Sequence, residues 1–235
     1  MMQRHTRALG WGLAVLVACG FTLLGGWQLQ RMQAKQARLD GAVAAGTLAP
    51  VALADALARD GLVQVEDHGR FLPGVVLLDN QIRRGRAGVK VYRPFQSDAG
   101  ARVLVDLGWR PLPPDRALPF PATAPTASRI RGLLAPPPSP GLAIGPAVTT
   151  AGPGRWLATR LLPADLGPVM GVVDLPMRVL RLDPSMPFGD VRDLDLLPNT
   201  LPPQRHLGYA VQWFGLALAV LVVALVMDRR RLRPT

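Results

Sequence analysis

Two uninterrupted apolar stretches, one near each end, dominate the pattern of hydrophobic and polar positions. Residues 207–227 carry no charge, and Thr22 is the clearest polar member of residues 8–27. At about 1.5 Å per helical residue each run covers roughly 30 Å, the thickness of a bilayer's hydrocarbon core. A soluble helix of this length normally carries a polar stripe. We therefore predict two transmembrane helices, at residues 8–28 and 207–227.

The first helix is expected to continue beyond the membrane. Residues 28–39 are strong helix formers and Asp40-Gly41 is a plausible stop, so the helix should end near residue 39. An alternative is a lipoprotein signal, because Leu16-Val17-Ala18-Cys19 resembles a lipoprotein cleavage box. The apolar residues after Cys19 argue against cleavage, and a secretory signal peptide would need a shorter apolar region.

Between the two helices the pattern changes to the alternation and turn signals of strands. The runs of this kind are residues 63–71, 75–80, 89–95, 102–110, 129–134, 155–160 and 177–182, with short helices expected at 51–59 and 163–171. Residues 111–140 contain ten prolines and should form an extended loop around the strand at 129–134. The predicted fold is a membrane protein in which two transmembrane α-helices flank one β-rich α+β domain, residues 36–205. That domain is expected to be an antiparallel sheet or a small, partly open barrel.

The charge distribution predicts an orientation. The net charge is +11, yet residues 36–205 hold 19 basic and 15 acidic residues, so most of the excess lies at the ends and membrane flanks. This disfavours nucleic-acid binding. Only two of the 27 basic residues are Lys, a bias typical of a GC-rich bacterial genome. The basic tail at 228–235 and the lead at 1–7 should be cytoplasmic and the domain periplasmic, in a bacterial inner membrane. The basic residues after the first helix favour the opposite orientation, and we give the tail more weight.

The sequence offers little to an enzyme. Cys19 is the single cysteine, which excludes an intrachain disulfide and a cysteine-based metal site. Glu66, Asp67 and His68 are adjacent in a predicted strand, where alternate side chains point to opposite faces and do not converge. We predict that the protein is not an enzyme, and that it has no catalytic residues.

Two groups of side chains flank the predicted membrane segments. His206, Tyr209 and Trp213 are spaced i, i+3 and i+7 and share one helical face. On the simplest interpretation the two aromatic residues are interfacial anchors and the histidine is solvated. The second group contains four residues: Gly26 and Trp27 at the end of the first apolar run, and Arg31 and Lys35 just after it. These anchor the helix or form a docking edge for a partner, since Gly25-Gly26 would allow another helix to approach closely.

Four sequence blocks together resemble the Surfeit locus protein 1 family, whose members are cytochrome c oxidase assembly factors. The first is Leu24-Gly25-Gly26-Trp27-Gln28-Leu29-Gln30-Arg31, continuing to Lys35. The others follow in order, at residues 69–95, 103–111 and 206–214, the last reading His206-Leu207-Gly208-Tyr209 onward. The chain departs from the family pattern at Leu107, Gln81 and Arg160.

The resemblance implies a cytochrome c oxidase biogenesis factor that assists haem a insertion into, or assembly of, the catalytic subunit. It points to His206 as a haem ligand, and a neutral imidazole is a standard axial ligand to haem iron. Tyr209 and Trp213 would pack against the porphyrin, and Arg205 would pair with a propionate. The expected partners are the catalytic subunit and haem a synthase. The alternative is a membrane-anchored periplasmic scaffold for oxidase subunits that binds no cofactor.

Overall fold

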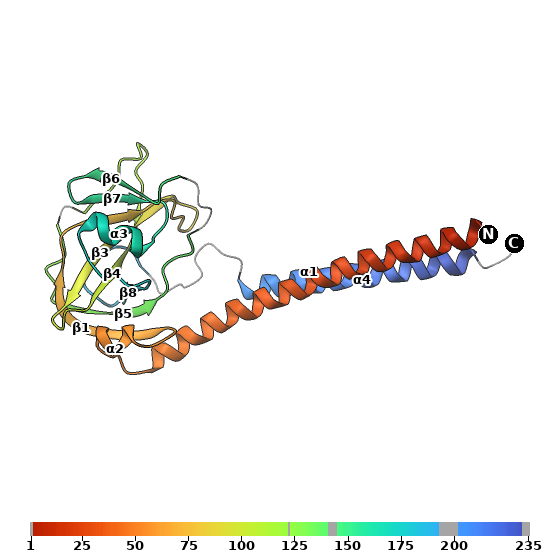
Figure 1. The fold of residues 1–235 in the computed structure, drawn as a ribbon, viewed down its shortest axis with the longest axis horizontal. Helices are drawn as coiled ribbons and strands as arrows, with labels where there is room; N and C mark the ends of the chain where they lie inside the picture. Colours follow the sequence, from red (N-terminus) through yellow and green to blue (C-terminus); the bar gives the residue numbers. More distant parts are fainter. Residues whose placement is uncertain (1, 122, 141–144, 193–201, 232–235) are drawn as a thin grey trace. The chain divides into compact units, whose positions relative to one another are not determined.

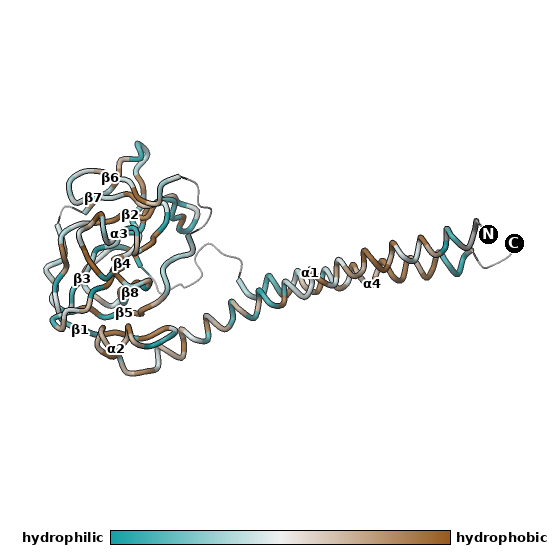
Figure 2. The backbone as a smooth tube through the Cα atoms, viewed as in Figure 1, coloured by the Kyte–Doolittle hydropathy of each residue, from teal (hydrophilic) through white to brown (hydrophobic). Residues whose placement is uncertain are grey.

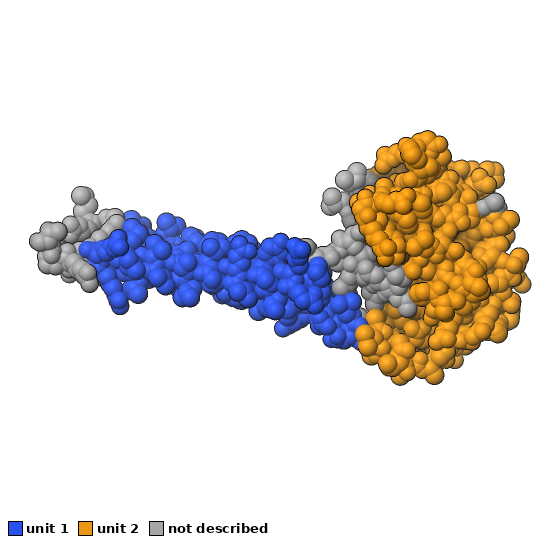
Figure 3. All heavy atoms as spheres, turned by 180° about the vertical axis from the view of Figure 1, so that it is seen from behind, with its two compact units in different colours: residues 1–40, 200–235 blue, residues 41–199 orange. Residues whose placement is uncertain are grey.

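The computed structural model describes residues 2–121, 123–140, 145–192 and 202–231. The chain divides into two compact units, residues 1–40 with 200–235 and residues 41–199 (Figure 3). The first unit is built by two long helices, α1 (Met2–Thr47) and α4 (Pro203–Arg231), and α1 continues into the second unit. The two helices lie side by side and run antiparallel (Figure 1): Arg7 contacts Asp228 at one end of the pair, and Gln28 contacts His206 towards the other.

Both helices are long and apolar enough to cross a membrane. Figure 2 shows the apolar residues concentrated along the paired parts of α1 and α4. Large side chains such as Leu23, Val211 and Leu218 are exposed on their outer surfaces. A contiguous apolar surface of this size is rare on a soluble monomer, so the pattern fits a membrane protein.

The helix pair has a seam of small residues. Ala14, Ala18 and Gly25 of α1 and Ala210 and Ala217 of α4 are all buried. Their spacings are those of residues that recur on one helical face, so each helix presents a narrow stripe to the other. A Cβ atom built on Gly25 would lie 2.8 Å from the ring of Phe214, so the aromatic ring packs directly on the glycine backbone. Small residues in the seam allow the two backbones to approach closely.

Helix α1 is longer than the sequence suggested, since it passes through Asp40-Gly41 and ends at Thr47. Gly41 in a helix interior costs about 1 kcal/mol relative to alanine. The alanines that follow it are the best helix formers, and the buried Ala45 adds a tertiary contact. These contributions offset the cost of Gly41, and the helix continues through it.

The second unit contains two short helices and an eight-stranded sheet with the order β1-β5-β8-β4-β3-β2-β7-β6. Its elements are α2 (Leu53–Leu57), β1 (Val63–Phe71), β2 (Val75–Leu78), β3 (Gly88–Ser97), β4 (Arg102–Pro111), β5 (Arg129–Ala135), β6 (Val148–Gly152), β7 (Arg155–Ala158), α3 (Pro163–Met170) and β8 (Val179–Leu182).

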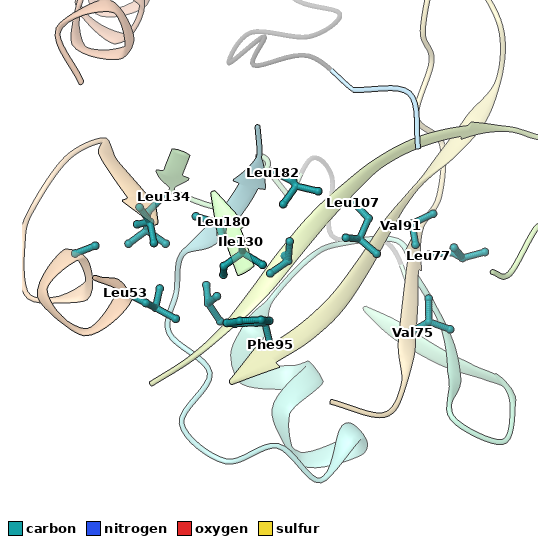
Figure 4. Packing of buried hydrophobic residues seen from close by; sticks show 14 of the residues in the cluster. Leu53, Val75, Leu77, Val91, Phe95, Leu107, Ile130, Leu134, Leu180 and Leu182 are labelled. Atoms are coloured by element: carbon teal, nitrogen blue, oxygen red, sulfur yellow. The ribbon is translucent and has the colours of Figure 1, made fainter. Parts of the chain in front are cut away.

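A further pairing between β1 and β3 closes five of the strands into a barrel. The predicted class, two apolar helices flanking a β-rich domain, is confirmed. Most pairs are antiparallel, but β4 pairs with β8 and β2 with β7 in parallel. The main core includes Phe95, Ile130 and Leu180, which Figure 4 shows gathered between the strands.

A second apolar cluster covers the other face of β3 and β4. It contains Tyr92 and Leu104, and Leu166 brings α3 against them. Successive residues of a strand point to opposite faces, so Tyr92 and Phe95, three residues apart, lie in different clusters. A β-bulge interrupts the β3–β4 pairing between Val91 and Tyr92. The central strands are thus buried on both sides, which explains their nearly continuous apolar sequences.

A buried ionic network interrupts this second face. Asp106 is 4% exposed; its carboxylate accepts a hydrogen bond from Lys90 Nζ at 2.7 Å and one from the Gly108 backbone at 3.0 Å. The Tyr92 hydroxyl donates to the same carboxylate at 3.3 Å. Burial, followed by the charge of Asp106, raises the pKa of Tyr92 well above its usual value, so the tyrosine stays protonated and remains a donor. The buried Arg181 acts on the same tyrosine.

The acidic residues of β1 have structural partners. Asp67 Oδ2 accepts a hydrogen bond from the Leu53 backbone at 2.8 Å, which satisfies one free N–H at the start of α2. Glu66 pairs with Arg129 across the β1–β5 ladder at 2.6 Å. At the other end of α2, Arg178 donates to the backbone carbonyls of Ala56 and Arg59. The Glu66-Asp67-His68 sequence therefore supports the fold and forms no convergent site.

Candidate functional site at the helix pair

The residue singled out by the sequence, His206, lies in the first turn of α4. Pro203 opens this helix, a position where a missing N–H has no consequence and the fixed φ suits the first turn. His206 is followed at helical spacing by the seam residues Ala210 and Ala217, so its side chain points toward α1. It is 7% exposed, although sequence alone allowed it to be solvated.

Gln28 of α1 fixes the orientation of this imidazole. The side-chain oxygen of Gln28 lies 2.7 Å from His206 Nδ1. An amide oxygen only accepts hydrogen bonds, so Nδ1 carries a proton, and the neutral form of the ring then has its lone pair on Nε2. Nε2 is buried and makes no hydrogen bond to any residue that the structure describes. The arrangement presents one nitrogen as a free Lewis base and uses the other to hold the ring.

Positive charge surrounds the histidine. The charges of Lys35 and Arg31, on the same helix as Gln28, both act on the imidazole. Arg205 is exposed beside it on α4. The Arg31 guanidinium lies 5.4 Å from the centre of the Trp27 ring, a cation–π contact on the outer surface of α1. A ligand that carries negative groups near its metal would meet cations from both helices here.

Two aromatic rings lie about two turns deeper along the pair. Trp213 packs on Phe21 with ring centres 5.5 Å apart, and both are half-buried in the seam. Tyr209 is 41% exposed and lies on the outer surface, so it does not join Trp213 in the seam. Of the proposed cofactor-binding residues, His206 and Trp213 face α1, whereas Arg205 and Tyr209 are directed outward.

Of the four residues proposed to bind a partner, two lie near His206 and two do not contribute to the site. Arg31 and Lys35 lie near the histidine, so the structure unites two groups that the sequence kept apart. Trp27 is 48% exposed. Gly26 has open space where a Cβ would be, and the glycine used for helix packing is its neighbour Gly25.

Sequence reasoning missed the role of Gln28. The signal was present, because Gln28 follows Gly25 by three residues and shares the helical face of Ala14 and Ala18. Since that face is otherwise small and apolar, a glutamine on it needs a partner on the other helix. The same reasoning finds Phe21, which lies four residues before Gly25 on this face.

The described part of the chain contains no other candidate centre of this kind. No group of three or more His, Cys, Asp or Glu side chains that could hold a metal ion occurs there. His68 is exposed on β1, and Cys19 is an exposed free cysteine on α1. The histidine in the helix pair is thus the feature with the clearest ligand chemistry.

The fold and this site define a membrane-associated protein with one barrel domain, and comparison with known families is more specific. The model of the SURF1 family matches residues 15–218, most of the chain. The chain therefore belongs to the SURF1 family. It is accordingly a cytochrome c oxidase assembly factor and not an enzyme. A comparison with curated proteins found no match.

Proposed function

We propose that the protein assists haem a insertion into the catalytic subunit of cytochrome c oxidase by binding haem a at His206. The observation that carries this proposal is the His206 side chain, 7% exposed, with Nδ1 held by Gln28 and Nε2 left with its lone pair. His206 would hold the iron of a bound haem through Nε2, because a neutral imidazole nitrogen is a standard ligand to haem iron.

The surrounding residues fit the rest of such a ligand. Arg31, Lys35 and Arg205 offer cations to carboxylate groups at the end of the helix pair, and Trp213 with Phe21 offers ring surface on the apolar side. Gln28 holds the imidazole in the tautomer that leaves Nε2 basic, as second-sphere partners of metal-bound histidines commonly do. Coordination would require the seam to open locally, because both helices enclose Nε2.

That enclosure also supports a second candidate, a scaffold that binds no cofactor. On this hypothesis the only role of the His206–Gln28 hydrogen bond is to hold α1 against α4. That role alone would be served equally well by an amide, whereas a buried nitrogen without a hydrogen bond costs about 1–3 kcal/mol. We therefore favour the ligand role. The deciding experiment is the visible spectrum of the protein purified in detergent from cells that make haem a: an absorbing haem supports the first candidate and its absence the second.

We further propose that the barrel is periplasmic and both ends of the chain cytoplasmic, in a bacterial inner membrane. The antiparallel pair places Arg7 and the arginines after Asp228 at one end, which favours the cytoplasmic side. A periplasm-active reporter inserted near Pro138 should be active, and one fused after Thr235 should be silent. Activity after Thr235 would contradict this topology.

We propose that Arg31 contributes to docking of the oxidase subunit. Arg31→Ala should reduce oxidase assembly and leave the protein's own abundance unchanged, because an exposed cation–π contact contributes only about 0.5–1 kcal/mol. The measurement is oxidase activity in membranes together with an immunoblot of the variant. Arg70→Ala, an exposed arginine on β1, is the matched control and should change neither. A parallel fall in abundance would instead assign Arg31 to anchoring α1.

A further inference from the structure

The second unit contains a small pocket that the assembly role does not explain. It has a volume of about 210 Å³, equal to that of roughly seven waters at about 30 Å³ each. Arg93 of β3 and Leu107 and Arg110 of β4 form one side of it. The other sides are formed by Phe188–Asp190 and by the proline-rich segment after β4, where Thr123 is exposed to solvent.

Arg93 is the unusual member of this pocket. It is 5% exposed, and burying a guanidinium normally requires a carboxylate partner. Among the described residues it donates to three neutral backbone carbonyl groups, Gly74 at 3.2 Å, Pro121 at 3.4 Å and Thr123 at 3.2 Å, all longer than the usual 2.9–3.0 Å. Its Nε is buried without a hydrogen-bond partner among the described residues. Burial, and then the charge of Arg110, lower the pKa of the Arg93 guanidinium.

The pocket has a net positive charge. Arg110 is neutralised by Asp190, whose carboxylate lies 2.5 Å from its Nε, and it donates a second bond to the Pro119 carbonyl. The two arginines and one aspartate that line the pocket leave one positive charge, located on Arg93. A single negative charge beside Arg93 would balance it, whereas a dianion would leave an excess of negative charge.

We propose that this pocket binds the carboxylate group of a small monocarboxylate. The Arg93 Nε–H has no hydrogen-bond partner among the described residues, so it would donate to one carboxylate oxygen, and the single negative charge would balance the guanidinium. The volume admits a few non-hydrogen atoms beside the carboxylate, and Leu107, Phe188 and Pro125 provide an apolar surface for a short hydrocarbon tail. The pocket lies entirely in the second unit, so this proposal does not depend on whether His206 binds haem.

The test uses propionate as the probe and the full chain in a deuterated detergent. Saturation-transfer NMR should show saturable binding at constant ionic strength. Arg93→Gln should raise the Kd at least tenfold because it removes the charge. Ala124→Leu should do the same by filling the pocket, and it leaves Arg93 and its carbonyl contacts in place, so it carries the test if Arg93→Gln does not fold. Arg129→Gln is the matched control: this arginine of β5 does not line the pocket and pairs with Glu66, so the variant should bind propionate as the wild type does.

Three outcomes would overturn the proposal. The first is no saturable binding of propionate to the wild type. The second is a folded Ala124→Leu variant that binds propionate with unchanged affinity. The third is displacement of propionate by inorganic phosphate when the phosphate concentration is lower than the propionate concentration. That result would assign the pocket to a tetrahedral anion.

Discussion

Replacing His206 with alanine should leave the protein in the membrane at normal abundance, remove its haem absorbance and reduce the amount of active oxidase. The imidazole is the one described side chain of the helix pair with a free basic nitrogen in the seam, and alanine has no ligand atom. The seam around it consists largely of small apolar residues, which an alanine fits. The Soret band of the purified variant, measured against protein concentration, checks the expectation.

Two further variants separate loss of the ligand from other effects on haem binding. His68→Ala removes an exposed histidine of β1 and should keep the full haem content. Gln28→Ala leaves the ligand but releases its ring, so haem should still bind, with its affinity reduced by roughly tenfold, the lower end of the usual loss when such a partner is removed. Unchanged haem content in His206→Ala would exclude His206 as the ligand and support the scaffold hypothesis.

The largest loss of stability is expected from Asp106→Ala in the barrel. Asp106 holds Lys90 Nζ, the Tyr92 hydroxyl and the Gly108 backbone in a site where its side chain is 5% exposed. Removing one member of a buried pair leaves the other charge uncompensated and costs about 3–5 kcal/mol. We expect the free energy of unfolding, measured by denaturant titration of the solubilised protein, to fall by about that amount.

Glu66→Ala is the matched control for this prediction. Its partner Arg129 lies at a similar distance, 2.6 Å, but the two side chains are 31% and 54% exposed. Ion pairs of this kind contribute up to about 1 kcal/mol, so the loss should be small. An equal fall in the free energy of unfolding in both variants would contradict the explanation that burial makes the Asp106 interactions more stabilising.

Local sequence signals were sufficient for most of the fold. Strand signals in residues 63–71 and 102–110 identified β1 and β4, although β1 is mostly half-buried and β4 is buried along nearly its whole length. The strand β6, Val148–Gly152, was not predicted, because its largely exposed residues carry no apolar alternation. The parallel pairing of β4 with β8 joins segments far apart in sequence, and no local pattern records such a partner.

The candidate site was only half visible in the sequence. His206 was conspicuous because a histidine at the edge of an apolar run needs an explanation. Its exposure and its bond to Gln28 depend on how α1 faces α4, which periodicity in one helix does not determine. Tyr209 shows the same limit, since a helical spacing of four residues placed it near Trp213, whereas the packing leaves it outside the seam.

The two polar pairs of the first unit also set the register of the helices. Apart from Phe214 on Gly25 and Trp213 on Phe21, the described seam consists largely of small residues, so apolar packing opposes sliding of α1 along α4 only weakly. Arg7 meets Asp228 and Gln28 meets His206, and the stretches 7–28 and 206–228 have nearly equal lengths. A slip by one helical turn would separate both pairs at once and strand polar groups against hydrocarbon. The helix pair is therefore pinned at two points, and a ligand that draws His206 away from Gln28 would release one of them.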